Sequence, residues 1–139
     1  MYYNIDKIYV DGKKISLKDE VAKHEITIVD FWASWCGPCM HEVPNLVSIY
    51  NKYKDSGLGI VGISLDEDED SWKSAIEENK MSWTQLSDLQ GWDNAAARLY
   101  GVESIPHILV VNKKGEIIAK DLRGEELKSC IEDQQFCEN

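Results

Sequence analysis

A chain of 139 residues is long enough for one globular domain that buries about two-thirds of the surface its unfolded form exposes. It carries 15 basic and 25 acidic residues, and this net charge of −10 excludes the basic surface that binds nucleic acid or anionic lipid. Hydrophobic residues make up 43% and charged residues 29%, which excludes a disordered or fibrous protein. With no linker, repeat or low-complexity segment, we predict a single domain over residues 1–139.

Two apolar runs and one amphipathic run organise the first half of the chain. Residues 26–32 and 58–65 are nearly continuous in β-forming residues, as in interior strands of a parallel sheet covered by helices on both faces. Between them, residues 39–54 have the spacing of an amphipathic helix, which the proline inside it is expected to bend. Residues 7–17 alternate around an Asp-Gly pair, which predicts a hairpin, and a short helical turn to about Ala22 follows.

The sequence pattern of the second half of the chain predicts three helices, two strands and one turn. The helices are expected at 71–79, 92–100 and 125–135, the strands at 107–111 and 116–120, and the turn at 112–115. Gly101 marks the end of the second of these helices. The element order predicts a small α/β sandwich with parallel strands and an antiparallel hairpin at one edge.

The strongest chemical signal is the pair Cys36 and Cys39, which lies between a predicted strand and a predicted helix. At a helix start, unpaired N–H groups and the helix dipole stabilise a thiolate, so we expect Cys36 at the cap and Cys39 facing inward. A thiol pKa below the usual value of about 8.5 makes Cys36 a nucleophile and a good leaving group. Pro38 suits the first helical turn, and Gly37 leaves the sulfur open to approach.

Other uses of the pair compete with this interpretation. A zinc site needs a second half, but Cys130 and Cys137 are seven residues apart and the histidines are scattered. A c-type haem attachment needs a histidine where Met40 stands. A purely structural pair is the third alternative. If the last helix continues, Cys130 and Cys137 lie about 10 Å apart, too far for a disulfide, so we expect Cys130 to pack and Cys137 to lie in the tail.

Several stretches resemble one known family. Val29–Cys39 is similar to the active-site stretch of the thioredoxin superfamily, and Met40–Pro44 narrows the resemblance to bacterial envelope thiol–disulfide oxidoreductases of the TlpA and ResA type. Tyr100–His107 and Val110–Ile117 agree with it, and Glu67–Leu89 fits the extra helix and strand of that branch. The resemblance implies a thioredoxin-like three-layer α/β/α sandwich with a central mixed sheet, an N-terminal hairpin and a helix–strand insert.

The resemblance also implies roles for individual residues. Cys36 would be the attacking cysteine and Cys39 the resolving one, and Pro106 would be a cis-proline facing the pair. Asp30 would be the buried carboxylate that accepts a proton from Cys39, and Glu42 would be the active-site glutamate of the envelope branch. The simpler alternatives are a structural buried acid at Asp30 and an ordinary surface residue at Glu42.

A substrate groove lined by Trp35 and Ile105 is expected beside the cysteines.

Two positions depart from the family pattern. His107 stands where threonine is usual, and we expect it to start a strand rather than contact a substrate. Gly62 stands where cytosolic thioredoxins usually carry a lysine, which argues against a plain cytosolic thioredoxin. The other tryptophans are expected in the core or at its edge: Trp32, Trp72, Trp83 and Trp92.

The acidic block Asp66–Asp70 lacks the ligand spacing of a calcium loop, so we expect it to lead into a helix N-terminus. No apolar run approaches the roughly 18 residues of a membrane span, and Met1–Asp6 has no signal-peptide pattern. We therefore expect a domain that does not insert into a membrane. A targeting segment, if the protein works outside the cytoplasm, is expected to be missing from this chain.

We expect a thiol–disulfide oxidoreductase that reduces protein disulfides, because Gly-Pro between the cysteines resembles the strongly reducing end of the family. Its partners would be protein thiol or disulfide substrates and an upstream thiol reductant. It would need no cofactor besides the Cys36–Cys39 disulfide and no metal, and it would act as a monomer. The envelope or periplasm is favoured, with the cytoplasm as the alternative. A non-catalytic binding module and a peroxiredoxin-like peroxidase are the alternative functions.

Overall fold

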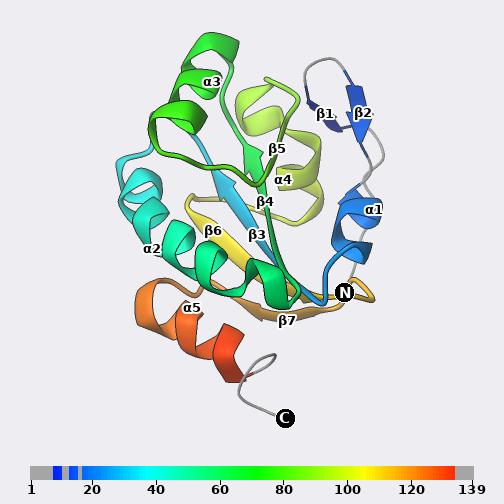
Figure 1. Ribbon diagram of the computed structural model, residues 1–139. Helices are drawn as coiled ribbons and strands as arrows, with labels where there is room; N and C mark the ends of the chain where they lie inside the picture. The colour runs from blue at the N-terminus through cyan, green and yellow to red at the C-terminus, as the bar shows by residue number, and fades with distance from the viewer. Residues whose placement is uncertain (1–7, 11–12, 16, 134–139) are drawn as a thin grey trace.

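The computed structural model describes residues 8–10, 13–15 and 17–133, and a five-stranded mixed sheet forms its centre (Figure 1). The strand order is β5-β4-β3-β6-β7. The strands are β3 (Ile26–Trp32), β4 (Leu58–Ser64), β5 (Thr84–Ser87), β6 (His107–Asn112) and β7 (Ile117–Lys120). β3, β4 and β5 are parallel, whereas β6 and β7 run antiparallel to their neighbours, so the predicted edge hairpin is confirmed.

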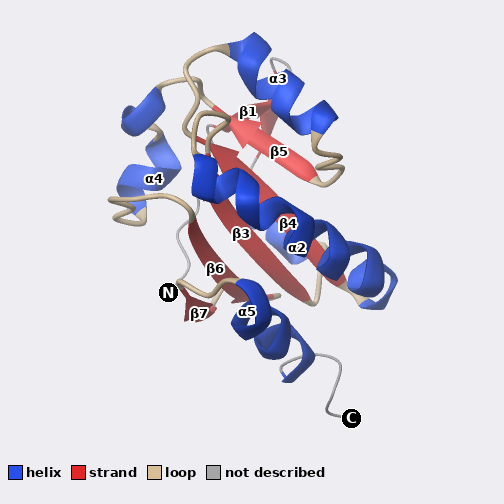
Figure 2. Cartoon of the chain, turned by 90° about the vertical axis from the view of Figure 1, so that its left-hand side faces the viewer, coloured by secondary structure: helices blue, strands red, loops and turns tan. Residues whose placement is uncertain are grey.

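Helices cover both faces of this sheet, as the apolar strands require. They are α1 (Leu17–Ala22), α2 (Gly37–Tyr53), α3 (Glu69–Glu78), α4 (Ala95–Leu99) and α5 (Gly124–Ile131), with 3₁₀ turns η1 (Lys54–Ser56) and η2 (Gly91–Asp93). Figure 2 shows α2 and α5 on one face and α4 on the other, which confirms the three-layer prediction. In the described part of the chain, no helix is long and apolar enough to cross a membrane.

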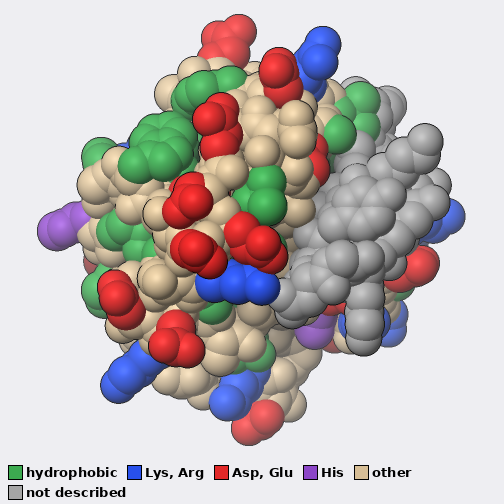
Figure 3. All heavy atoms as spheres, turned by 90° about the horizontal axis from the view of Figure 1, so that it is seen from above, with side chains coloured by type: hydrophobic (Ala, Val, Ile, Leu, Met, Phe, Trp, Pro, Cys, Tyr) green, Lys and Arg blue, Asp and Glu red, His purple; other side chains and the backbone are tan. Residues whose placement is uncertain are grey.

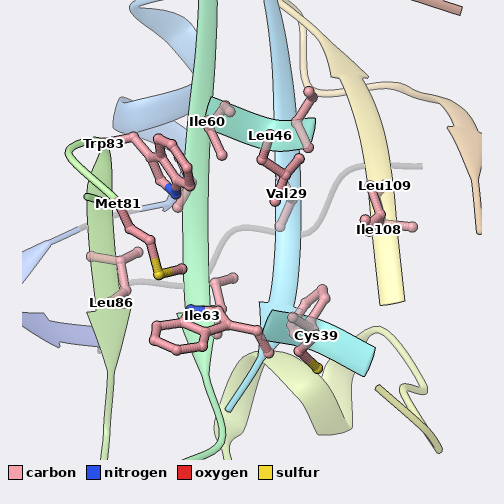
Figure 4. Packing of buried hydrophobic residues seen from close by; sticks show 14 of the residues in the cluster. Val29, Cys39, Leu46, Ile60, Ile63, Met81, Trp83, Leu86, Ile108 and Leu109 are labelled. Carbon is pink, nitrogen blue, oxygen red and sulfur yellow. The ribbon is translucent and has the colours of Figure 1, made fainter. Parts of the chain in front are cut away.

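The two central strands carry the core. Every residue of β3 and β4 is buried, as their near-continuous apolar runs predict. α2 packs one apolar side against these strands and continues past Pro44 as a single helix. Its buried residues are Cys39, Val43, Leu46, Ile49 and Tyr53. Figure 4 shows Leu46 of α2 beside Val29 of β3. The helix that begins directly after Cys36 is thus fixed by packing, at about 1.5–3 kcal/mol per large apolar side chain.

The N-terminal hairpin is confirmed in outline but is shorter than expected. β1 (Ile8–Val10) pairs with β2 (Lys13–Ile15) as a separate two-stranded sheet, and the predicted Asp-Gly turn lies outside the described residues. The prediction that Leu17 belongs to the hairpin is wrong. Leu17 begins α1 and is buried, because its apolar side chain packs in the core from the first helical turn.

The prediction of one helix from Trp92 to Tyr100 is also wrong at its start. η2 precedes the helix, and α4 begins only at Ala95, because the buried Asn94 caps it by accepting a hydrogen bond from Ala97 N at 2.9 Å. This shift leaves Trp92 outside the helix, with 47% of its surface exposed rather than packed in the core. Trp32, Trp72 and Trp83 are buried as predicted.

Candidate active site

Cys36 and Cys39 form a disulfide with Cα atoms 5.2 Å apart. Cys36 is the N-cap of α2, and its sulfur accepts a hydrogen bond from Cys39 N at 3.2 Å. Pro38 lies in the first helical turn, and a Cβ atom added at Gly37 would meet nothing within 4 Å. The predicted local geometry is therefore confirmed: the first sulfur lies at the positive end of the helix, which stabilises a thiolate there after reduction.

A second loop closes over this pair from the β6 side. The Ile105–Pro106 peptide bond is cis, as the resemblance implies, and the Ile105 carbonyl oxygen lies 3.8 Å from Cys36 Sγ. Trp35 stands directly before Cys36 in the chain and is 57% exposed. The two residues expected to line a substrate groove are therefore both neighbours of Cys36, Ile105 through space and Trp35 along the chain.

Asp30 lies in the middle of β3, where it pairs with Gly62 of β4 and Ile108 of β6, and it is 2% exposed. Burial, with a smaller contribution from the negative charge of Glu42, raises the pKa of Asp30 to about 7. A carboxyl group with this pKa exchanges protons at neutral pH, which an ordinary structural aspartate does not do.

Glu42 is not an ordinary surface residue, because its carboxylate is hydrogen-bonded to α5 and to its own helix. The residue is half-buried, and its Oε2 accepts hydrogen bonds from Gly124 N at 2.9 Å and from Asn45 Nδ2 at 2.8 Å. Asn45 Nδ2 also donates to the Gly124 carbonyl at 3.2 Å. Glu42 therefore ties the first residue of α5 to the active-site helix while it repels the charge on Asp30. Its bond to Gly124 spans 82 residues, so the sequence offered no signal for it.

Replacing Glu42 with glutamine is expected to lower the pKa of Asp30. The glutamine oxygen can still accept the Gly124 N–H, but the negative charge that disfavours ionised Asp30 is gone. A ¹³C-NMR titration of the Asp30 carboxyl in the oxidised protein measures this directly. Glu126→Gln removes the same charge from an exposed position of α5 and should leave the titration in place. An Asp30 pKa that is unchanged or higher in the Glu42 variant would contradict the coupling.

The departure at Gly62 has a packing reason. Gln85 of β5 places its amide over Gly62 and accepts a hydrogen bond from Trp32 Nε1 at 3.1 Å. A Cβ at residue 62 would collide with the Gln85 oxygen and come within 3.0 Å of Trp32 Nε1. A side chain at position 62 would therefore require the Gln85 amide to move and to give up its hydrogen bond with Trp32, which accounts for the glycine here.

Asp66 anchors the loop that leads to the cysteines, a role that the sequence did not reveal. Its carboxylate accepts hydrogen bonds from Ser34 N at 3.1 Å, from Ser34 Oγ at 2.6 Å and from Ser64 Oγ at 2.6 Å. The expectation for the rest of the acidic block is confirmed, because Asp68 caps α3 by accepting from Ser71 N at 2.9 Å. The block thus starts a helix and also fixes the active-site loop.

Three further residues singled out in the sequence are His107, Cys130 and Cys137. His107 starts β6 as predicted, and its Nδ1 lies 2.8 Å from Asp121 Oδ1. Cys130 is a free, half-buried cysteine of α5 that packs against the core. Burial and the charge of Asp133 raise its thiol pKa, which makes it a poor nucleophile. Cys137 lies outside the described residues. No group of three possible metal ligands occurs among the residues that are described.

Comparison with known proteins decides the family. Residues 24–117 match the family model described as thioredoxin-like. The chain belongs to the thioredoxin-like family. It is 31% identical over 124 residues to the thiol-disulfide oxidoreductase ResA of Bacillus thuringiensis subsp. konkukian, a match that covers 89% of this chain and 68% of that protein. The sporulation thiol-disulfide oxidoreductase A of Bacillus subtilis is 29% identical over 111 residues, covering 78% and 64% of the two chains.

Solved structures agree with this thioredoxin-like assignment. The thioredoxin domain of a thiol-disulfide oxidoreductase from Bacteroides vulgatus superimposes with a TM-score of 0.84 and 37% identity, over 95% of this chain and 93% of that one. A thiol-disulfide oxidoreductase from Bacteroides fragilis gives 0.83 and 29% identity, over 96% of both chains. The resemblance to ResA-type proteins is confirmed, and with the Cys36–Cys39 disulfide the chain is a thiol–disulfide oxidoreductase.

Proposed function

We propose that this thioredoxin-like domain reduces disulfides in protein substrates through Cys36 and Cys39. The observation that carries the proposal is the position of Cys36, whose sulfur accepts a backbone N–H at the start of α2 and faces the Ile105 carbonyl. An extended substrate can approach this sulfur past Gly37, where the structure leaves open space. The domain is proposed to comprise residues 1–139 and to act as a monomer.

The proposed reaction conserves electrons and protons. The Cys36 thiolate attacks one sulfur of the substrate disulfide, which forms a mixed disulfide and releases the other substrate sulfur as a thiolate that takes up a proton. The Cys39 thiol then transfers its proton to ionised Asp30, and the new thiolate attacks Cys36 Sγ. The second substrate sulfur leaves, and the Cys36–Cys39 disulfide seen in the structure forms. Two electrons pass to the substrate, and an upstream dithiol restores the reduced enzyme.

The direction of transfer follows from which form of the pair is stabilised. Cys39 is 2% exposed and lies against the apolar core, so burial disfavours its thiolate. Ionisation of Cys39 therefore does not stabilise the dithiol form of the pair. A dithiol that lacks this stabilisation gives its electrons to a substrate disulfide more readily. We also propose an envelope location, outside the cytoplasm, and an upstream thiol as the reductant, as the resemblance to the ResA type implies.

The test is a stoichiometric transfer experiment with the reduced, wild-type chain. Mixed with excess insulin under argon, each chain should lose two thiols, gain one intramolecular disulfide and generate two insulin thiols. A binding module would leave the thiols of both proteins unchanged. A peroxidase would lose its thiols faster to hydrogen peroxide than to insulin. Either result would contradict the proposed reductase function.

A further inference from the structure

A cavity of about 360 Å³ opens beside the active-site loop, and Ser34 and Trp35 form part of its lining. It is bounded by the loop before Cys36, the start of α3 and the η2 turn. Its lining includes Ser34, Trp35, Asp66, Glu67, Asp68 and Trp92. We call it the Trp35–Trp92 cleft. Because Trp35 directly precedes Cys36 and lines the cleft, the cleft lies within reach of a polypeptide bound at the disulfide.

The two tryptophans make this cleft unusual on the surface. Trp35 is 57% and Trp92 is 47% exposed, and together with Leu99 they are the large hydrophobic side chains that the described residues leave exposed. Trp92 is exposed because Asn94 starts α4 after it, and Gly91 precedes it with φ +58, a conformation that other residues rarely adopt. The fold therefore leaves about half of Trp92 exposed at the cleft, where a bound polypeptide would cover it.

Carboxylates accompany the tryptophans. Glu67 and Asp68 are exposed at the edge of the cleft, and the Glu67 side chain lies directly over Gly91, next to Trp92. Asp66 is buried at the base, and the lining includes no lysine, arginine or histidine. Figure 3, which views the molecule from above Figure 1, shows several acidic side chains near the middle of this face, with hydrophobic ones beside them and a basic one in contact with them. An aromatic face beside a carboxylate is a matched site for a lysine or arginine side chain.

We propose that the Trp35–Trp92 cleft binds a lysine or arginine of the substrate polypeptide, a few residues from the cysteine that Cys36 attacks. This inference rests on the proposed reductase function and adds a preference among its substrates. The cation would lie against the indole rings and near Glu67, while the chain's net charge of −10 attracts basic segments from a distance. The cleft would thus select basic protein disulfides over acidic ones.

The experiment mixes the reduced chain with an excess of each of three disulfides and follows its single-turnover oxidation, whose second-order rate constant is the kcat/KM of that half-reaction. Two are peptides that are identical except that lysines or glutamates flank the cystine, and the third is 2-hydroxyethyl disulfide, which is neutral and too small to reach the cleft. At low salt, kcat/KM for the lysine peptide should exceed that for the glutamate peptide by about tenfold, and the ratio should shrink in 0.5 M NaCl. Trp92→Ala should lower kcat/KM for the lysine peptide by about fivefold, and Glu67→Gln by about threefold.

Glu78→Gln provides the matched control, because it removes the same charge from the exposed opposite end of α3. It should leave the preference for the lysine peptide intact. Equal rates for the two peptides in the wild-type chain, with 2-hydroxyethyl disulfide still reduced, would overturn the cleft proposal alone. An equal loss for all three disulfides in Trp92→Ala would also overturn it. Failure of the wild-type chain to reduce any of the three would instead overturn the reductase function, and the cleft proposal with it.

Discussion

Replacing Cys36 with serine is expected to lower insulin reduction by at least about 1,000-fold, to the uncatalysed rate. The serine hydroxyl can still accept the Cys39 N–H that the sulfur accepts now, so the start of α2 is expected to persist. What is lost is the nucleophile, because a serine hydroxyl at a helix start stays protonated at neutral pH. Initial rates with dithiothreitol as the electron source measure the effect, and circular dichroism confirms the fold.

Two companion variants make this result specific. Cys39→Ser should form the mixed disulfide and then stop, so a covalent complex with substrate should accumulate that dithiothreitol releases. Cys130→Ser should retain full activity, because its raised thiol pKa and half-buried position on α5 keep it out of the exchange. Reduction that persists in Cys36→Ser would contradict the assignment of the nucleophile.

Replacing Asp30 with asparagine is expected to stabilise the protein at alkaline pH. The pKa of Asp30 is about 7 in the folded chain against 3.8 when unperturbed, so the folded state keeps a proton that the unfolded state releases. Above pH 3.8 the carboxyl therefore lowers the free energy of unfolding progressively, and the loss is complete once the pH has passed 7. At about 1.4 kcal/mol per pH unit, the variant should gain on the order of 4 kcal/mol at pH 9.

The same substitution should slow catalysis. Loss of a positioned general base costs about 100-fold or more in the step it serves, here the deprotonation of Cys39. In the wild-type chain, release of the mixed disulfide should accelerate as the pH rises through about 7 and Asp30 loses its proton. Urea unfolding of the oxidised protein at pH 5 and pH 9, with stopped-flow kinetics over the same range, measures both effects. A stability difference independent of pH would contradict the raised pKa.

Much of the fold was predictable because local patterns and tertiary packing agree. The runs that became β3 and β4 are apolar on both faces and are buried on both, and the spacing of α2 matches the side that it buries. The cysteine pair was predictable for a similar reason. Its position depends on a local feature, the start of the helix, and Cys36 is the N-cap of that helix.

The supporting contacts were not predictable, because they join segments that are distant in sequence. Asp66 reaches Ser34 across 32 residues, and Glu42 reaches Gly124 across 82. Both depend on strand register and helix placement that no local pattern encodes. Trp92 was misplaced for a different reason. The sequence predicted a helix that begins at Trp92, but the cap at Asn94 determines that the helix begins at Ala95.

The reductase function requires a reversible, strongly reducing exchange between the dithiol and the disulfide of Cys36 and Cys39, and the midpoint potential of this pair tests it most directly. Equilibration in dithiothreitol redox buffers can be followed by the fluorescence of Trp32 and Trp35, which lie close to the cysteines in the chain. We expect one two-electron transition near about −270 mV, as in reducing thioredoxins. A value near about −120 mV, or no reversible transition, would contradict the reductase function.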